Sequence, residues 1–309
     1  MAKYLKTKIK EALFTAVYYQ ANINTNKAII VVIDDEDDGL MNKACAKWLC
    51  NDLKINTLCI GIKQDHKFKG LNEWPLEIIE AAINYLKANQ ISKIGIVGMS
   101  MQSSIALKSA TLFKDLSLVL AFSPNDFISW GFKQGRLGKY NNAEWPTYQS
   151  SLSYQSKPLA YHSIDLDAEA YYQMYLDAKA KYHEMHSIDI FEYSEKVLPI
   201  KEEAFVDLEN AKAQIILIAA KDDSMWDASR YSKRLEKRLS DHDYQYGFKV
   251  LSYEYGTHLL MPESIYKYAI PIFYDRVTDI YVSGKKHHQE CIDARMDLER
   301  KLNDLLTKW

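Results

Sequence analysis

The sequence predicts an α/β protein with a mostly parallel sheet flanked by helices. Two observations support this prediction: short strands composed almost wholly of apolar residues, and amphipathic helical patterns that alternate with them. Strands that are apolar on both faces are typical of a parallel sheet covered on both sides. Because 48% of the 309 residues are hydrophobic, the chain can bury one sizeable core. We expect a single domain over residues 1–309.

The expected elements follow one another along the chain with one long interruption. Turn-forming residues between positions 22 and 26 separate the first two strands. Pro75 suits the first turn of a helix, and the last helix carries an apolar stripe. We expect strands at 12–20, 28–33, 57–62, 94–97, 116–122, 214–219 and 248–253, and helices at 40–53, at 71–89, from 101, at 228–239 and at 286–306.

The interruption lies between residues 123 and 208. It is first rich in Tyr, Trp, Ser and Asn, and it becomes helical over residues 167–181. Ligand sites in such sheets lie at the carboxyl edge of the strands. We therefore interpret residues 124–206 as a lid inserted over that edge, with aromatic residues that line an apolar pocket. These aromatic residues are Trp130, Tyr140, Trp145, Tyr148 and Tyr154.

Composition and charge argue against several classes of protein. The formal net charge of −2 gives no reason to expect a nucleic-acid partner or binding to a membrane surface. No apolar run approaches the ~20 residues that a membrane span needs, and the basic N-terminal segment lacks the apolar stretch of a signal peptide. We expect a cytoplasmic protein with no cofactor and no metal ion, because the cysteines form no metal-type spacing and fit a reducing compartment. They are Cys45, Cys50, Cys59 and Cys291.

The stretch from residue 93 to residue 108 points to a chemical function. An apolar strand ends at Gly98 and a helical pattern begins at Met101, so Ser100 lies where the strand turns into the helix. Such a turn exposes the serine hydroxyl and directs the following backbone N–H at a developing oxyanion. We predict Ser100 as a nucleophile and the N–H of Met101 as an oxyanion donor. The alternative is an ordinary polar turn, since Gln102 replaces the second glycine of the G-x-S-x-G motif.

Two further polar sites directly follow expected strands. Asp222 and Asp223 come after the strand at 214–219, and His258 lies in a Gly-Thr-His loop after the last strand. The order Ser…Asp…His at the carboxyl ends of strands is that of an α/β-hydrolase triad, in which the imidazole removes the serine proton and the carboxylate orients the imidazole. Asp223 is favoured as the acid because Trp226 can wall it at that distance past the strand. Asp222 is the close alternative, and both residues could be solvated loop acids.

Residues 34–39, Asp-Asp-Glu-Asp-Asp-Gly, form an acidic loop after the second strand. The fold places its other oxyanion donor there, and the backbone N–H of Glu36 is our candidate. An EF-hand is excluded, because position 45 is Cys where the calcium loop requires Glu. The alternative is an acidic N-cap on the helix that begins at Leu40. So many carboxylates near a developing anion would be unfavourable unless they point to water.

Two histidines of the interrupted region suggest a different kind of site. His183 and His186 stand at i and i+3 on an expected helix and could pair on a metal ion. No matching ligand cluster accompanies them, so a solvated helix face is favoured. The other histidines that do not follow a strand as His258 does are His66, His162, His242, His287 and His288.

Six short motifs, taken together, carry a resemblance to a known family. They are Leu71-Asn-Glu-Trp-Pro-Leu-Glu77, Gly98-Met-Ser100, Ser123-Pro124, Trp130-Gly131, Asp222-Asp223-x-x-Trp226 and Gly256-Thr-His258. Over roughly residues 25–309, this set resembles the C-terminal catalytic domain of acyl-CoA thioesterases and bile acid-CoA:amino acid N-acyltransferases. We expect no counterpart of the N-terminal immunoglobulin-like domain that the animal members carry.

The resemblance implies an α/β-hydrolase fold with Ser100, Asp223 and His258 as the triad. In that family a serine nucleophile goes with hydrolysis and a cysteine with acyl transfer to amino acids, so Ser100 implies hydrolysis. The chain departs from the family pattern at Gln102, in the acidic loop at 34–38, and at Thr257, which separates the glycine from the histidine.

Three hypotheses about function follow. The leading one is a serine hydrolase whose partner is a small-molecule substrate, either an acyl thioester such as acyl-CoA or a small carboxylic ester. The second is an enzyme of the same fold that cleaves another acyl bond, with dienelactone-hydrolase-like or peptidase activity. The third is a catalytically inactive relative used for binding, which the acidic loop favours and the Ser…Asp…His set opposes.

Overall fold

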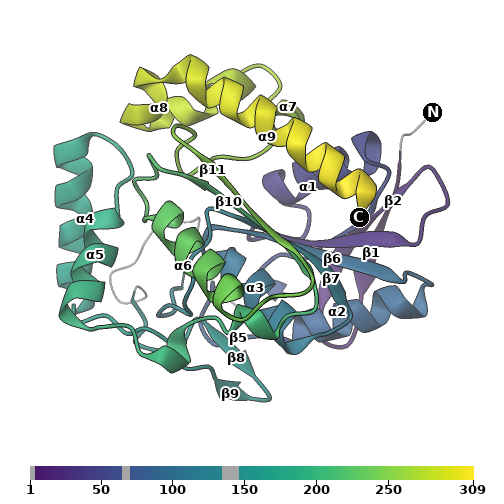
Figure 1. Cartoon of the computed structure of the whole chain (residues 1–309), viewed down its shortest axis with the longest axis horizontal. Helices are drawn as coiled ribbons and strands as arrows, with labels where there is room; N and C mark the ends of the chain where they lie inside the picture. Colours follow the sequence, from purple (N-terminus) through teal and green to yellow (C-terminus); the bar gives the residue numbers. More distant parts are fainter. Residues whose placement is uncertain (1–3, 65–69, 134–145) are drawn as a thin grey trace.

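An eight-stranded sheet forms the centre of the fold (Figure 1). The computed structural model describes residues 4–64, 70–133 and 146–309. Within these residues the strands of this sheet pair in parallel, except that β2 is antiparallel to both of its neighbours. The predicted α/β class with a mostly parallel sheet is therefore confirmed. The order across the sheet is β1 (Tyr4–Lys10), β2 (Thr15–Ala21), β4 (Asn56–Cys59), β3 (Lys27–Val32), β6 (Lys93–Met99), β7 (Leu116–Phe122), β10 (Gln214–Ala220) and β11 (Phe248–Tyr253).

Helices cover both faces of the sheet. They are α1 (Leu40–Lys47), α2 (Glu77–Ala88), α3 (Ser103–Leu112), α6 (Ala228–Asp241), α7 (Glu263–Ala269) and α9 (His288–Lys308). In Figure 1, α7 and α9 lie above the sheet, and α2, α3 and α6 lie below it. Successive residues of a strand point to opposite faces, and Ile30 of β3 packs in the cluster with α2, α3 and α6, while Ile29 packs in the cluster with α1, α7 and α9. Both isoleucines are fully buried, which explains why the central strands are apolar throughout.

The helix predicted from residue 71 begins instead at Glu77. The residues just before it form the short strand β5 (Trp74–Pro75) of a second, three-stranded sheet. The N–H groups of Trp74 and Leu76 each donate to a backbone carbonyl of the insertion at 2.9 Å, and Pro75, which has no N–H, falls between these two donors. The prediction that Pro75 lies in the first turn of the helix is therefore wrong.

Several described elements were not predicted. β1 is one of them, because its side chains are mostly exposed and include lysines, so that it lacks the apolar pattern of a buried strand. Such charged side chains are common on edge strands, where they discourage pairing with other chains. The other unpredicted elements are α5 (Ile188–Val197), α7, α8 (Val282–Lys286), β8 (Leu152–Tyr154), β9 (Lys157–Pro158) and three 3₁₀ segments (Glu202–Ala204, Leu208–Asn210 and Tyr274–Ile280).

The last helix, α9, docks along the apolar stripe that the sequence predicts. Cys291, Leu298 and Leu302 are fully buried. Arg295 is buried on the same helix, where its Nε donates to Glu263 of α7 at 2.8 Å. This ion pair joins the two helices. In the part of the chain that the structure describes, no helix is both long and apolar enough to cross a membrane.

In its described residues, the insertion between β7 and β10 contains two α-helices and two strands of the three-stranded sheet. The helix predicted at 167–181 is confirmed by α4 (Ala168–Tyr182), which lies beside α5 in Figure 1. β8 pairs with β5 and β9, which ties the insertion to the segment before α2. Tyr140 and Trp145 of the predicted aromatic group, and also His66, lie outside the described residues. That residues 124–206 act as a lid remains a prediction.

His162 lies buried inside the insertion, near the aromatic rings of Phe127 and Trp130. Its Nε2 is 2.9 Å from the hydroxyl of Ser194 on α5. Burial lowers the pKa of His162 to about 4. The imidazole is therefore neutral in the folded protein at pH 7, and protonating it would place a charge in this aromatic cluster.

We predict that His162 makes the fold sensitive to acid. The folded pKa is lower than that of the unfolded chain, about 6.5, so the unfolded state takes up the proton first. The stability that depends on the neutral ring is thus present above the unfolded pKa and lost as the pH falls toward the folded pKa. Between pH 7 and pH 4.5, the free energy of unfolding should fall by about 2 kcal/mol more in the wild type than in His162→Gln. Urea titrations at both pH values measure this difference, and an identical fall in both proteins would contradict the prediction.

Candidate active site

Ser100 lies at a tight turn between β6 and α3. Its backbone is left-handed, with φ of +57°, which is uncommon for a residue with a side chain. Gly98 makes this turn possible, because a Cβ at that position would lie 2.4 Å from the carbonyl oxygen of Gln102. The close approach and the positive φ have the geometry of a nucleophile elbow, in which the serine side chain projects from the end of the strand. The motif keeps this geometry although Gln102 replaces its second glycine.

The structure brings together the three residues of the predicted triad. His258 Nε2 is 2.9 Å from Ser100 Oγ, and His258 Nδ1 is 2.8 Å from Asp223 Oδ2. Since an ionised carboxylate only accepts hydrogen bonds, Nδ1 carries the proton and donates to Asp223. Nε2 is then free to accept from the serine hydroxyl. A hydrogen-bond chain runs from Asp223 to Ser100, although 158 positions separate His258 from Ser100 in sequence.

Asp223 is held in place by the loop that carries it. The N–H groups of Met225 and Trp226 donate to its Oδ1 at 2.8 and 3.4 Å. The Trp226 ring meets the His258 ring edge to face, with centroids 5.1 Å apart, and its Nε1 donates to the carbonyl of Ser123 at 3.2 Å. Trp226 therefore walls the Asp223–His258 pair, as the sequence predicts.

Asp222 lies next to the triad but has other partners. It accepts hydrogen bonds from the N–H of Thr257 at 2.8 Å and from the hydroxyl of Ser283 on α8 at 2.7 Å. Burial raises the pKa of Asp222 above its usual value, against the effect of these hydrogen bonds. Of the two candidate acids, the structure thus brings Asp223 to the imidazole, and Asp222 ties the His258 loop to α8. Sequence patterns gave no signal for Ser283, because it lies 61 positions from Asp222.

Ser123 supports the histidine from the end of β7. Its hydroxyl donates to the carbonyl oxygen of His258 at 2.9 Å, and its N–H donates to Ile218 of β10 at 2.8 Å. Its own φ is +44°. The sequence singled out Ser123 only as part of a family motif, and its contact with His258 gives that motif a physical role.

Carboxylates of the acidic loop accept hydrogen bonds from groups close to them. Asp34 accepts from the N–H of Met41 in the first turn of α1 at 2.9 Å. The N-cap residue itself is Gly39, so the interpretation of an acidic N-cap residue is wrong, although a carboxylate of the loop does bind the start of the helix. Asp37 accepts from the N–H of Gly61 at 2.7 Å, and Asp38 accepts from Lys6 at 2.6 Å. These charges are compensated by local donors rather than by water alone.

The two predicted oxyanion donors are the backbone N–H groups of Met101, beside the Ser100 turn, and of Glu36, in the acidic loop. Met101 directly follows Ser100 and is buried. The carbonyl of Glu36 accepts from Gly39 N–H and from Asn42 Nδ2, both at 3.0 Å, which fixes the loop around it. Gly61 allows the close packing of this loop, since a Cβ there would lie 2.4 Å from the carbonyl oxygen of Asp35. The two N–H groups remain candidates for the oxyanion site.

The histidine pair of the insertion does not lie on one helix face. His183 ends α4 with a φ of +59°, and His186 follows in the connection to α5. His186 is buried and stacks on Tyr182 with ring centroids 3.9 Å apart, so the interpretation as a solvated helix face is wrong for this residue. Among the described residues there is no cluster of three or more His, Cys, Asp or Glu side chains suited to a metal ion.

With this geometry in place, the sequence can be compared with known families. The model of the family described as BAAT / acyl-CoA thioester hydrolase C terminal matches residues 74–266, more than half of the chain. The chain belongs to this family. The resemblance seen in the sequence motifs is confirmed, and the matched span includes Ser100, Asp223 and His258.

Solved structures of other hydrolases have a similar fold. A dienelactone hydrolase-like phosphotriesterase from metagenomic libraries has a TM-score of 0.52 at 10% identity, covering 99% of this chain and 97% of the other. An esterase of Pyrococcus furiosus has a TM-score of 0.51 at 12% identity, covering 99% and 92%. No curated protein matches the sequence. These structures confirm the α/β-hydrolase fold, and the family indicates a hydrolase.

Proposed function

We propose that this protein is a serine hydrolase of acyl thioesters or small carboxylic esters. The observation that carries the proposal is the hydrogen-bond chain Asp223–His258–Ser100, which ends at a serine in a strained turn. The family supplies the thioester as a substrate class. Within that family, a serine rather than a cysteine at this position favours transfer of the acyl group to water.

The reaction follows from the geometry. Ser100 Oγ attacks the acyl carbonyl carbon while His258 Nε2 takes its proton, and Asp223 stabilises the resulting imidazolium. The carbonyl oxygen becomes an oxyanion that the N–H groups of Met101 and Glu36 would stabilise. The bond to the leaving thiolate or alkoxide then breaks, and His258 returns the proton to that group. Water, activated by the same imidazole, attacks the acyl-enzyme and releases the carboxylic acid.

The insertion is proposed to cover this site. Phe191 of α5 packs against Trp226 with ring centroids 5.2 Å apart, and Trp226 packs against His258. α5 is thus separated from the imidazole by one aromatic ring. An apolar cover of this kind would exclude water and bind an acyl chain.

The inactive alternative has less support than the sequence alone suggested. Its main argument was repulsion between the acidic loop and an oxyanion. Since Asp34, Asp37 and Asp38 have nearby donors, their negative charge is partly compensated before any substrate binds. Activity on another acyl bond remains the second candidate, because the same triad can attack esters, lactones and amides.

A panel of acyl-CoA thioesters and p-nitrophenyl esters of increasing chain length, assayed beside a set of lactones and peptides, tests the proposed function. We expect turnover of at least one thioester or ester, and we expect Ser100→Ala to lose about three orders of magnitude or more in kcat/KM, because it removes the nucleophile. Product release followed spectroscopically provides the measurement. Turnover of lactones or peptides alone would favour the second candidate, and unchanged turnover in Ser100→Ala would contradict the mechanism.

The two adjacent aspartates should differ sharply in their effect on turnover. Asp223→Asn should lower kcat by roughly 10⁴-fold, because the amide stabilises the wrong imidazole tautomer. Asp222→Asn should have a much smaller effect, since Asp222 contacts Thr257 and Ser283 rather than the imidazole. Both changes are nearly isosteric, and circular dichroism would check that both variants stay folded. Equal and mild losses would mean that neither residue orients His258, and the reverse ranking would assign the role to Asp222.

A further inference from the structure

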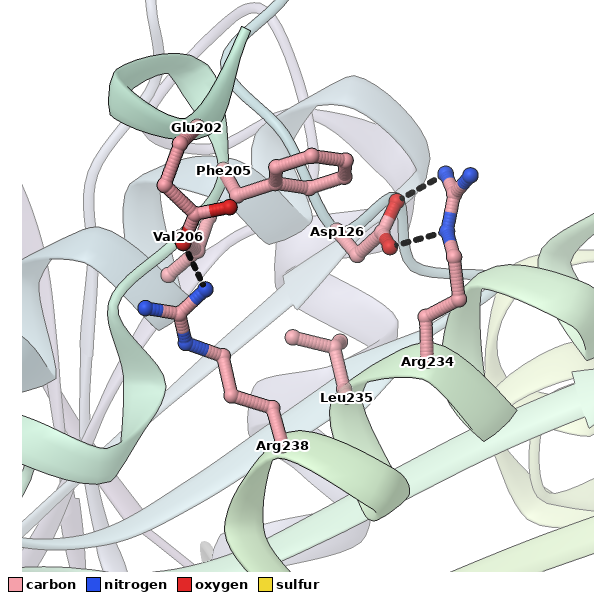
Figure 2. A pocket seen from close by; sticks show the side chains of 7 residues that line it. All are labelled: Asp126, Glu202, Phe205, Val206, Arg234, Leu235 and Arg238. Carbon is pink, nitrogen blue, oxygen red and sulfur yellow. Dashed lines mark hydrogen bonds and ion pairs between the residues drawn. The ribbon is translucent and has the colours of Figure 1, made fainter. Parts of the chain in front are cut away.

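One face of α6 carries arginines that bind carboxylates of the insertion and its flanks. Arg230, Arg234 and Arg238 are spaced by four residues, so their side chains lie along one side of the helix. We call these three residues the arginine face of α6. Figure 2 shows Arg234 paired with Asp126 and Arg238 paired with Glu202 around a small cavity of about 160 Å³.

Glu195 is the residue of α5 through which the arginine face binds that helix. Its Oε1 accepts from Arg230 Nη2 at 2.9 Å and from the hydroxyl of Tyr231 at 2.6 Å. Its Oε2 accepts from Arg230 Nη1 at 2.9 Å and from Arg234 Nη1 at 3.1 Å. Burial raises the pKa of Glu195, but the hydrogen bonds from Tyr231 and Arg230 outweigh it, so that the pKa lies below its usual value. Glu195 is therefore charged and binds three residues of α6.

An aromatic contact leads from this ion pair to the triad. Phe191 precedes Glu195 by one helical turn, so both side chains lie on the same side of α5. The Phe191 ring stacks on Trp130 with centroids 5.1 Å apart and meets Trp226 edge to face at 5.2 Å. Trp226 in turn contacts His258 at 5.1 Å. A shift of α5 would therefore displace the ring that walls the imidazole.

The start of α5 is bound to the loop after β10 that carries Asp223. We call this loop the acid loop; it is distinct from the acidic loop at residues 34–39. The N–H groups of Ser187 and Ile188 donate to the carbonyl of Ser224 at 3.0 and 3.1 Å, and the Ser187 hydroxyl donates to Met225 at 2.6 Å. Ser224 directly follows Asp223. The first residues of α5 thus contact the acid loop. Two turns further along the helix, Glu195 contacts α6.

We propose that Glu195 is a positioning residue: by binding the arginine face of α6, it holds Phe191 against Trp226 and thereby keeps Asp223 and His258 aligned with Ser100. Glu195 itself does not touch the reacting atoms. The inference rests on the proposed function for its effect on reactivity, but its effect on the acid loop can be measured without any substrate.

Two variants of the whole protein test this role. Glu195→Ala removes the contact with α6 from α5. Glu202→Gln is the matched control, because Glu202 pairs with Arg238 at 2.8 Å on the same face of α6 but lies on the 3₁₀ turn Glu202–Ala204 rather than on α5. Amide hydrogen exchange at Met225 and Trp226 reports on the acid loop, since both N–H groups donate to Asp223. The rate of fluorophosphonate labelling of Ser100 reports on the alignment of the triad.

In Glu195→Ala we expect exchange at Met225 and Trp226 to accelerate and labelling of Ser100 to slow, each by about tenfold, since a hydrogen bond to a charged group of this kind is lost. Glu195→Gln, which keeps one acceptor oxygen, should have a smaller effect, and Glu202→Gln should match the wild type in both measurements. Combining Glu195→Ala with Phe191→Leu should add little to the slower labelling, because both act through Trp226.

Unchanged exchange at Met225 and Trp226 in Glu195→Ala, or equal changes in Glu202→Gln, would overturn the inference, and so would additive effects of the Glu195 and Phe191 variants. A wild-type protein in which Ser100 is not labelled would contradict the proposed function instead. The exchange measurement would in that case still decide whether Glu195 holds the acid loop.

Discussion

The hydrogen bond from His258 Nδ1 to Asp223, 2.8 Å long, is the contact on which the rest of the site depends. It fixes the tautomer in which Nε2 can accept the serine proton, which is what the proposed role of Ser100 as a nucleophile requires. Its partners come from the ends of β10 and β11, which are adjacent and parallel in the sheet. The order of the strands therefore brings the two loops that carry the acid and the base to neighbouring positions at one edge of the sheet.

The surroundings of the triad stabilise this hydrogen bond from several sides. Trp226 covers it, Ser123 holds the carbonyl of His258, and Asp222 binds the neighbouring Thr257. Each of these contacts fixes a loop rather than a reacting atom. Preorganisation of this kind is what allows a catalytic group to act without reorganising in the transition state. The acidic loop is likewise held in place, because the carboxylate of Asp34 accepts a hydrogen bond from the first turn of α1.

The sequence predicts the fold, and it predicts the three residues that the structure brings together as the proposed triad, because both leave local signals. Apolar strands alternate with amphipathic helices, and Ser100, Asp223 and His258 each lie in the turn or loop that follows a strand. The start of α2 was misplaced because Trp74 and Leu76 bond to the insertion, an interaction without a local pattern. The role proposed for Glu195 could not be predicted from the sequence, because its contacts also leave no local pattern. Its partners lie on α6, more than thirty positions away, and a glutamate on an amphipathic helix is normally a solvent-exposed residue.

Trapping the acyl-enzyme tests the central claim most directly. The protein is mixed with a thioester that it hydrolyses, carrying an isotopically labelled acyl group. The reaction is stopped with acid within the first turnovers, and the peptides are mapped by mass spectrometry. The account predicts that the labelled acyl group is attached to Ser100 and that the peptide is absent in Ser100→Ala. Hydrolysis of the thioester with no acylated peptide, or with the acyl group on another residue, would contradict it.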